Sequence, residues 1–139
     1  MKRFPLVLLS IFCLTSAVFA GGPRISVTVT PTHVTNQGEE AVFTFTLSSP
    51  ATRRIAVQFF LSGGADLGGD YVLTGKFNKS AQLVIPVGET SATVTLHTFE
   101  EDIENDGQPE FATLDILPGP RYRVGSPSRA SVRIQNENF

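Results

Sequence analysis

The chain has 139 residues, with 11 Lys and Arg against 13 Asp and Glu, and a formal net charge of −2. This acidic balance argues against nucleic acid as a partner, because few clustered cations are available to displace phosphate counterions. The length suits one ordinary domain and is too short for two.

The first twenty residues are typical of a secretory signal peptide. Lys2 and Arg3 make the start positive, the run Leu6–Leu14 is almost entirely apolar, and Val18-Phe19-Ala20 places small residues at the two positions that a signal peptidase recognises. The sequence therefore predicts a signal peptide over residues 1–20, cleaved after Ala20, and a mature domain over residues 21–139. We expect the mature protein to be secreted or held in the periplasm or cell envelope.

A transmembrane anchor is not expected, since about 20 consecutive apolar residues are needed to cross a bilayer and this run is shorter. The only cysteine, Cys13, lies within it. The mature domain would then contain no thiol, so apolar burial and strand pairing must hold its fold. Removing Lys2 and Arg3 leaves nine basic residues (11 − 2) against 13 acidic ones, a formal charge of −4.

Alternation of apolar and polar residues with a period of two dominates from Arg24 onward, which predicts an all-β domain. Turn-forming Pro and Gly residues separate seven alternating segments. Seven strands with such turns predict an immunoglobulin-like antiparallel β-sandwich. The apolar residues of the predicted strands span Ile25–Val29, Ala41–Leu47, Ile55–Leu61, Leu83–Ile85, Ala92–Leu96, Ala112–Ile116 and Ala130–Ile134.

Few residues of the mature domain are suited to catalysis. The two histidines, His33 and His97, have no second His or Cys near them in sequence, which argues against a zinc site or a Cys-His nucleophile. Alternation with Leu96 predicts that His97 points to solvent. The sequence has no Gly-x-Ser-x-Gly turn, and the glycines between Gly63 and Gly69 have the character of a loop. We therefore do not expect an enzyme.

An acidic segment, Glu100–Glu110, is the most unusual feature of the sequence. It holds six carboxylates between two predicted strands, and no Lys or Arg occurs between Lys79 and Arg121. Calcium accepts six to eight oxygen ligands with little demand on geometry, so such a segment is suited to a hard cation. Charge alone is equally consistent with a solvated acidic loop.

Four short motifs in the correct order resemble the Calx-β domain family, over about Ile25–Asn138. The segment Gly125–Gln135 resembles the last strand of that family, with its Ser-Pro-Ser turn. The other three motifs are Gly69-Asp70-Tyr71, the hairpin Ile85–Thr90 and the acidic loop Glu101–Glu110. The resemblance implies a seven-stranded sandwich whose calcium sites, where present, gather at one end.

Carried over by position, the resemblance implies a set of candidate ligands for Ca²⁺. These are Asp70, Glu100, Glu101, Asp102, Glu110 and Glu137, with Asn36, Asn136 and Asn138 as weakened positions. The family has a glutamate at the position of Asn36 and aspartates at those of Asn136 and Asn138, so three formal charges are missing. Asparagine carbonyls still ligate calcium, so the substitutions weaken the predicted site without abolishing it.

The sequence thus leaves two functions open. The first is a secreted, calcium-binding interaction module of the Calx-β type that presents a surface to a protein or cell-surface partner. The second is a metal-free structural or adhesive sandwich that binds its partner through loops or edge strands.

Overall fold

The computed structural model describes residues 22–99 and 109–135, which form eleven strands and no helix. None of these residues belongs to a helix long and apolar enough to cross a membrane. The strands are β1 (Arg24–Thr30), β2 (His33–Thr35), β3 (Glu40–Leu47), β4 (Ile55–Val57), β5 (Phe59–Ser62), β6 (Tyr71–Gly75), β7 (Leu83–Ile85), β8 (Ser91–Thr98), β9 (Glu110–Ile116), β10 (Arg123–Val124) and β11 (Arg129–Gln135).

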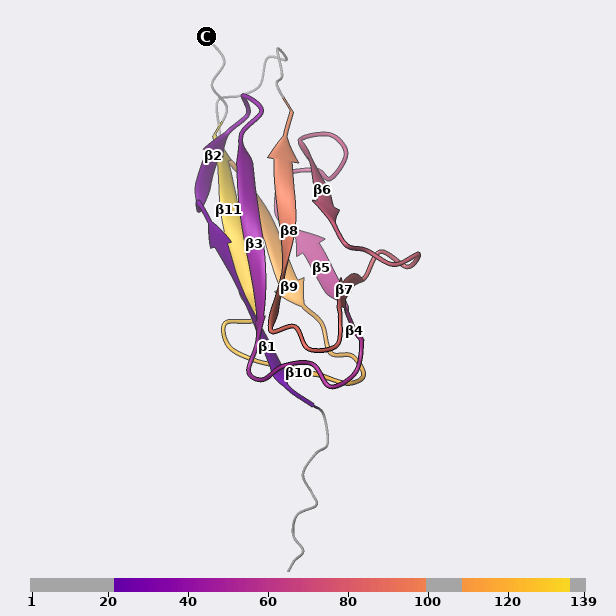
Figure 1. The fold of residues 1–139 in the computed structure, drawn as a ribbon. Coiled ribbons are helices and arrows are strands. Elements are labelled where there is room, and N and C mark those ends of the chain that lie inside the picture. The colour runs from indigo at the N-terminus through magenta and orange to yellow at the C-terminus, as the bar shows by residue number, and fades with distance from the viewer. Residues whose placement is uncertain (1–21, 100–108, 136–139) are drawn as a thin grey trace, which may run out of the picture.

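The strands form two main sheets that pack face to face (Figure 1). One sheet has the order β10-β1-β3-β8-β6 and the other β2-β11-β9-β5, while β4 and β7 form a separate two-stranded pair. β5 and β6 are the terminal strands of their sheets, and both lie on the same side of the sandwich (Figure 1). This arrangement confirms the predicted all-β sandwich.

The alternation seen in the sequence becomes the two faces of each sheet, because successive side chains of a strand point in opposite directions. Along β3, Ala41, Phe43 and Phe45 are fully buried, and the residues between them are more exposed. In-register pairs such as Val27–Phe45 and Phe43–Val94 stack these buried residues across the sheet. Such pairing fixes the register, since a shift of one residue would turn every apolar side chain to solvent.

The predicted strand count was wrong, because seven segments become eleven strands. The segment Ile55–Leu61 divides at Gln58 into β4, which pairs with β7, and β5, which pairs with β9. Inward and outward side chains still alternate across the division, so the pattern gives no sign that the chain changes partner. The hydroxyl of Tyr122 stabilises the chain where it divides at Gln58. It accepts a hydrogen bond from Gln58 N at 3.1 Å and donates one to Leu117 O.

Three further strands, β2, β6 and β10, were not predicted, and two of them make the sheets mixed rather than purely antiparallel. β10 runs parallel to β1, and β2 runs parallel to β11. Pro31 separates β1 from β2, which lie in different sheets. Proline has no N–H to donate to a ladder, so it suits a position where the chain leaves one sheet for the other.

Candidate functional site

Several strand ends meet at one pole of the sandwich, which we call the acidic pole. It comprises the β2–β3 turn, the loop before β6, the end of β8, the start of β9 and the end of β11. Backbone hydrogen bonds link these segments. The β2–β3 turn is joined to the end of β11 by Asn36 N to Gln135 O at 3.1 Å, and to the end of β8 by Thr98 N to Glu39 O at 2.9 Å. Phe99 N donates to Asp70 O at 3.2 Å in the loop before β6, and Ala65 N in the same loop donates to Phe111 O of β9 at 3.0 Å. The topology therefore brings four chain segments that the resemblance implicated to the same end.

Asn36 is buried in the β2–β3 turn, with only 3 % of its surface exposed. The turn is held by Glu39, whose Oε1 accepts from Thr35 N at 2.8 Å. Thr98, also buried, places its hydroxyl 2.9 Å from the carbonyl oxygens of both Thr35 and Glu39. These contacts link the turn that contains Asn36 to the end of β8.

Asp70 ends a tight loop directly before β6. Its Oδ2 accepts a hydrogen bond from Asp66 N at 2.7 Å, and Asp66 O in turn accepts from Asp70 N at 2.7 Å. The loop also brings two carboxylates close to Tyr71. Burial raises the pKa of the Tyr71 phenol, and the nearby charges of Asp66 and Asp70 raise it further. The loop thus concentrates negative charge at the acidic pole.

Glu110 is the first residue of β9 and lies in register with Ile134 near the end of β11. The loop after β5 packs closely against this part of β9. Gly63 has φ +101°, and a Cβ atom added there would lie 2.2 Å from Phe111 O. Only glycine allows the backbone to pass this close to Phe111 O. The chain then continues along the start of β9 into the loop that contains Asp70.

The structure locates three of the nine candidate ligands, and all three belong to the acidic pole: Asn36, Asp70 and Glu110. Glu100, Glu101, Asp102, Asn136, Glu137 and Asn138 lie outside the described residues, as does the predicted signal peptide. Within residues 22–99 and 109–135, no three His, Cys, Asp or Glu side chains are close enough to hold a metal ion. The described ligands would therefore need oxygens from elsewhere to complete a calcium site.

A row of polar side chains near the acidic pole was not predicted. His97 Nδ1 lies 2.7 Å from Glu40 Oε2, and His97 Nε2 lies 2.8 Å from Thr74 Oγ1. The side chain of His97 is 32 % exposed and that of Glu40 is 56 % exposed. Polar contacts between side chains this exposed contribute at most about 1 kcal/mol, so the row serves as a modest link between β3, β8 and β6. The register of the sheet, not the local sequence, creates it.

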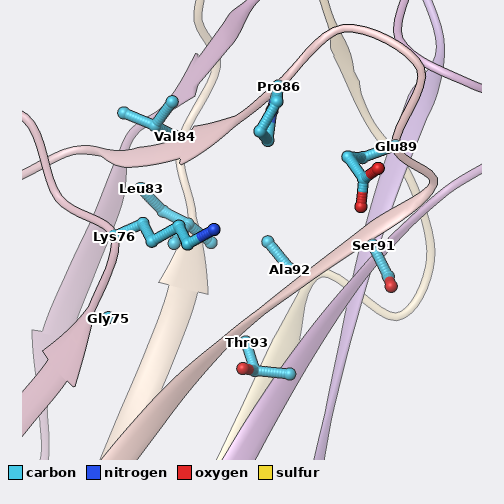
Figure 2. A pocket seen from close by; sticks show the side chains of 9 residues that line it. All are labelled: Gly75, Lys76, Leu83, Val84, Pro86, Glu89, Ser91, Ala92 and Thr93. Carbon is cyan, nitrogen blue, oxygen red and sulfur yellow. The ribbon is translucent and has the colours of Figure 1, made fainter.

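A groove of about 540 Å³ lies near the opposite pole, between β7 and β8 (Figure 2). There the two strands diverge into different sheets, and the turn that joins them carries Glu89. Lys76 lies over Leu83 on one side, and the carboxylate of Glu89 lies on the other (Figure 2). None of the candidate calcium ligands lines this groove.

No family model and no curated protein matches the sequence. Among solved structures, the fold resembles the crystal structure of CBD12 from CALX1.2, with a TM-score of 0.61 and 18 % sequence identity. The match covers 84 % of this chain and 46 % of that one, so this chain spans about half the length of the solved structure. CBD12 is a Calx-β structure of the immunoglobulin-like sandwich type. The chain therefore has a Calx-β-like fold.

Proposed function

We propose that this protein is an exported interaction module of the Calx-β type that binds calcium weakly at its acidic pole. The observation that carries the proposal is the set of backbone hydrogen bonds that gathers the segments of Asn36, Asp70, Glu110 and the end of β11 at one end of the sandwich. The Calx-β-like fold supports it, because these are the segments that the resemblance assigns to calcium. Export is proposed from the character of residues 1–20.

The proposed ligands are oxygens, as calcium requires. Asp70 would contribute the carboxylate oxygen that does not bind Asp66 N, and Glu110 would contribute from the start of β9. The remaining carboxylates would come from Glu100, Glu101, Asp102 and Glu137. The neutral Asn36, Asn136 and Asn138 reduce the ligand charge, so we expect a dissociation constant on the order of 10⁻⁴ to 10⁻³ M, the range of extracellular modules.

Calorimetric titration of the mature domain with calcium tests the proposal. We expect one weak binding event, and Asp70→Asn should weaken it by about tenfold, because affinity depends strongly on ligand charge. Asparagine retains a side-chain oxygen that accepts from Asp66 N, so the loop before β6 should keep its shape.

The matched control is Glu89→Gln, which removes one exposed carboxylate at the opposite pole. Like Asp70→Asn, it makes the net charge less negative by one unit, and it should leave the titration unchanged. Equal weakening by both variants would indicate nonspecific attraction of calcium to an acidic protein. The absence of any binding would favour the metal-free module.

A further inference from the structure

An apolar cleft opens on the side of the sandwich where the two sheets end in β5 and β6. Its volume is about 540 Å³, and all eight of its lining residues are apolar. Phe59, Phe60 and Leu61 of β5 line it on one side and Val72 and Leu73 of β6 on the other, and Leu67 also lines it. We call this the β5–β6 cleft. It involves none of the candidate calcium ligands.

The β5 wall offers unused backbone groups. Leu117 N donates to Gln58 O at 2.9 Å, so the backbone of Gln58 faces β9. In an antiparallel ladder the direction of these groups alternates, so Phe60 and Ser62 also face β9 while Phe59 and Leu61 face the open edge. Among the described strands, β5 pairs only with β9. Two residues of β5 therefore present N–H and C=O groups along the cleft.

The edge of β6 is less available. Phe99 N donates to Asp70 O, so the backbone of Asp70 faces β8 and that of Tyr71 faces the open side. Tyr71 O accepts from Gly68 N at 2.7 Å, and Gly75 O accepts from Phe77 N at 3.1 Å. These local bonds use the carbonyls at both ends of the strand. Leu73, between them, is the remaining open position, so β5 is the better template for an added strand.

The edge of β5 lacks the features by which sheet edges usually avoid further pairing. Its sequence Phe-Phe-Leu-Ser has no charge and no proline, and Phe60 is 57 % exposed. Natural edge strands commonly carry Lys, Pro or a bulge that prevents addition of another chain. An exposed apolar edge beside an apolar cleft is thus a recognisable surface for strand addition.

We propose that the β5–β6 cleft binds an uncharged, extended segment of a partner protein, which adds to β5 as a further strand and places alternate apolar side chains in the cleft. The lining favours apolar side chains, because a charged group would lose its hydration there without gaining a counter-ion. The open groups of Phe59 and Leu61 favour a peptide over an acyl chain, which could not use them. The cleft is concave, and a single strand fills a concavity better than an identical concave edge from a second copy.

The probe is a blocked, uncharged nonapeptide of alternating valine and threonine with a glutamine at each end, and binding is measured by fluorescence anisotropy. Two regioisomers are compared, one N-methylated at the valines and one at the threonines in the interior. The N–H groups of these two sets point to opposite edges of an extended strand. Strand addition to β5 predicts that one isomer binds like the parent peptide, whereas the other binds at least about tenfold more weakly.

Leu67→Ser in the protein should weaken binding of the parent peptide by about tenfold through loss of apolar contact. Val87→Ser is the matched control, since Val87 is 62 % exposed, Leu67 is 57 % exposed, and only Leu67 lines the cleft. Both substitutions are at exposed positions, and their melting curves report whether the fold is retained. Calcium should not affect any of these results, which separates this test from that of the proposed function.

Four results would overturn the proposal. Equal binding of both N-methylated isomers would mean that the cleft captures apolar groups without strand pairing. Equal effects of Leu67→Ser and Val87→Ser would mean that the peptide binds outside the cleft. The absence of binding by the parent peptide would mean that the cleft does not accept an added strand. Dimerisation of the wild-type chain that Leu67→Ser abolishes would identify a second copy as the occupant.

Discussion

The two tyrosines of the chain illustrate how single side chains stabilise this sandwich. Tyr71 is 1 % exposed and Tyr122 is 3 % exposed. Burial raises the pKa of both phenols. Asp66 and Asp70 raise the pKa of Tyr71 further, whereas the hydrogen bond from Gln58 N lowers that of Tyr122. Both side chains therefore hold their protons more tightly in the folded state than in the unfolded chain.

The raised pKa values predict loss of stability at high pH. A group whose pKa is higher when folded contributes its full stabilisation below the unfolded value, here about pH 10, and loses it as the pH rises through the folded value. The chain has no tryptophan, so near-ultraviolet absorbance reports tyrosinate without interference. At about pH 10 the folded protein should show less tyrosinate than the same protein in denaturant. Half-ionised phenols in the folded protein at that pH would contradict the burial of both rings.

At the scale of the elements, the β2–β3 turn is where the proposed calcium site departs most from the family pattern. Asn36 stands at the position of a family glutamate, and it is buried in a turn fastened by Glu39 and Thr98. Burying a carboxylate is costly without a counter-ion. A neutral residue at this position therefore favours a fold that is stable without metal, at the expense of affinity at the proposed calcium site.

Asn36→Asp tests this relation. The added carboxylate is nearly isosteric, and its burial should cost about 1–3 kcal/mol without calcium, which lowers the melting temperature. Calcium should then raise the melting temperature of the variant by more than that of the wild type, because the charge gains a cation. Thermal unfolding with and without calcium measures both effects. An equal loss under both conditions would exclude position 36 from the site.

The sequence predicted the elements whose side chains alternate clearly, including the short strand β7, but not β2, β6 or β10. β1, β3, β8, β9 and β11 each include the whole of the range expected for them and extend beyond it, and their inward residues form much of the core. β2 and β10 have three and two residues, too few to show a period. β6 alternates weakly after a glycine-rich loop. The division at Gln58 depends on pairing with distant strands, which local alternation does not encode.

The same limit applies to the candidate site. The family resemblance implied Asn36, Asp70 and Glu110 as candidate ligands, and the structure brings their segments to one pole. The contacts that hold this pole, such as Thr98 to Glu39 and Asp66 to Asp70, were not predicted. Thr98 is an ordinary strand residue in sequence and is buried only because the β2–β3 turn folds over the end of β8. The row Glu40, His97 and Thr74 likewise depends on cross-strand register.

At the scale of the whole molecule, the two proposed surfaces occupy different parts of the sandwich. The acidic pole lies where β2, β8, β9 and β11 begin or end, whereas the β5–β6 cleft lies along the open side between the sheets. Residues 66–70 connect them, because Asp70 belongs to the acidic pole and Leu67 lines the cleft. The two surfaces nevertheless share no residue, since none of the candidate ligands lines the cleft. Residues of one surface can therefore be substituted while those of the other are left unchanged.

Titration of isotopically labelled mature protein with calcium, followed by backbone amide chemical shifts, tests the central claim most directly. The account predicts saturable shifts for Asn36, Asp70 and Glu110 at millimolar calcium, on the order of the dissociation constants of extracellular modules. Amides at the opposite pole, such as those of Glu89 and Val124, should not move. Unchanged amides at the acidic pole at saturating concentration, or shifts spread over both poles, would contradict a calcium site there.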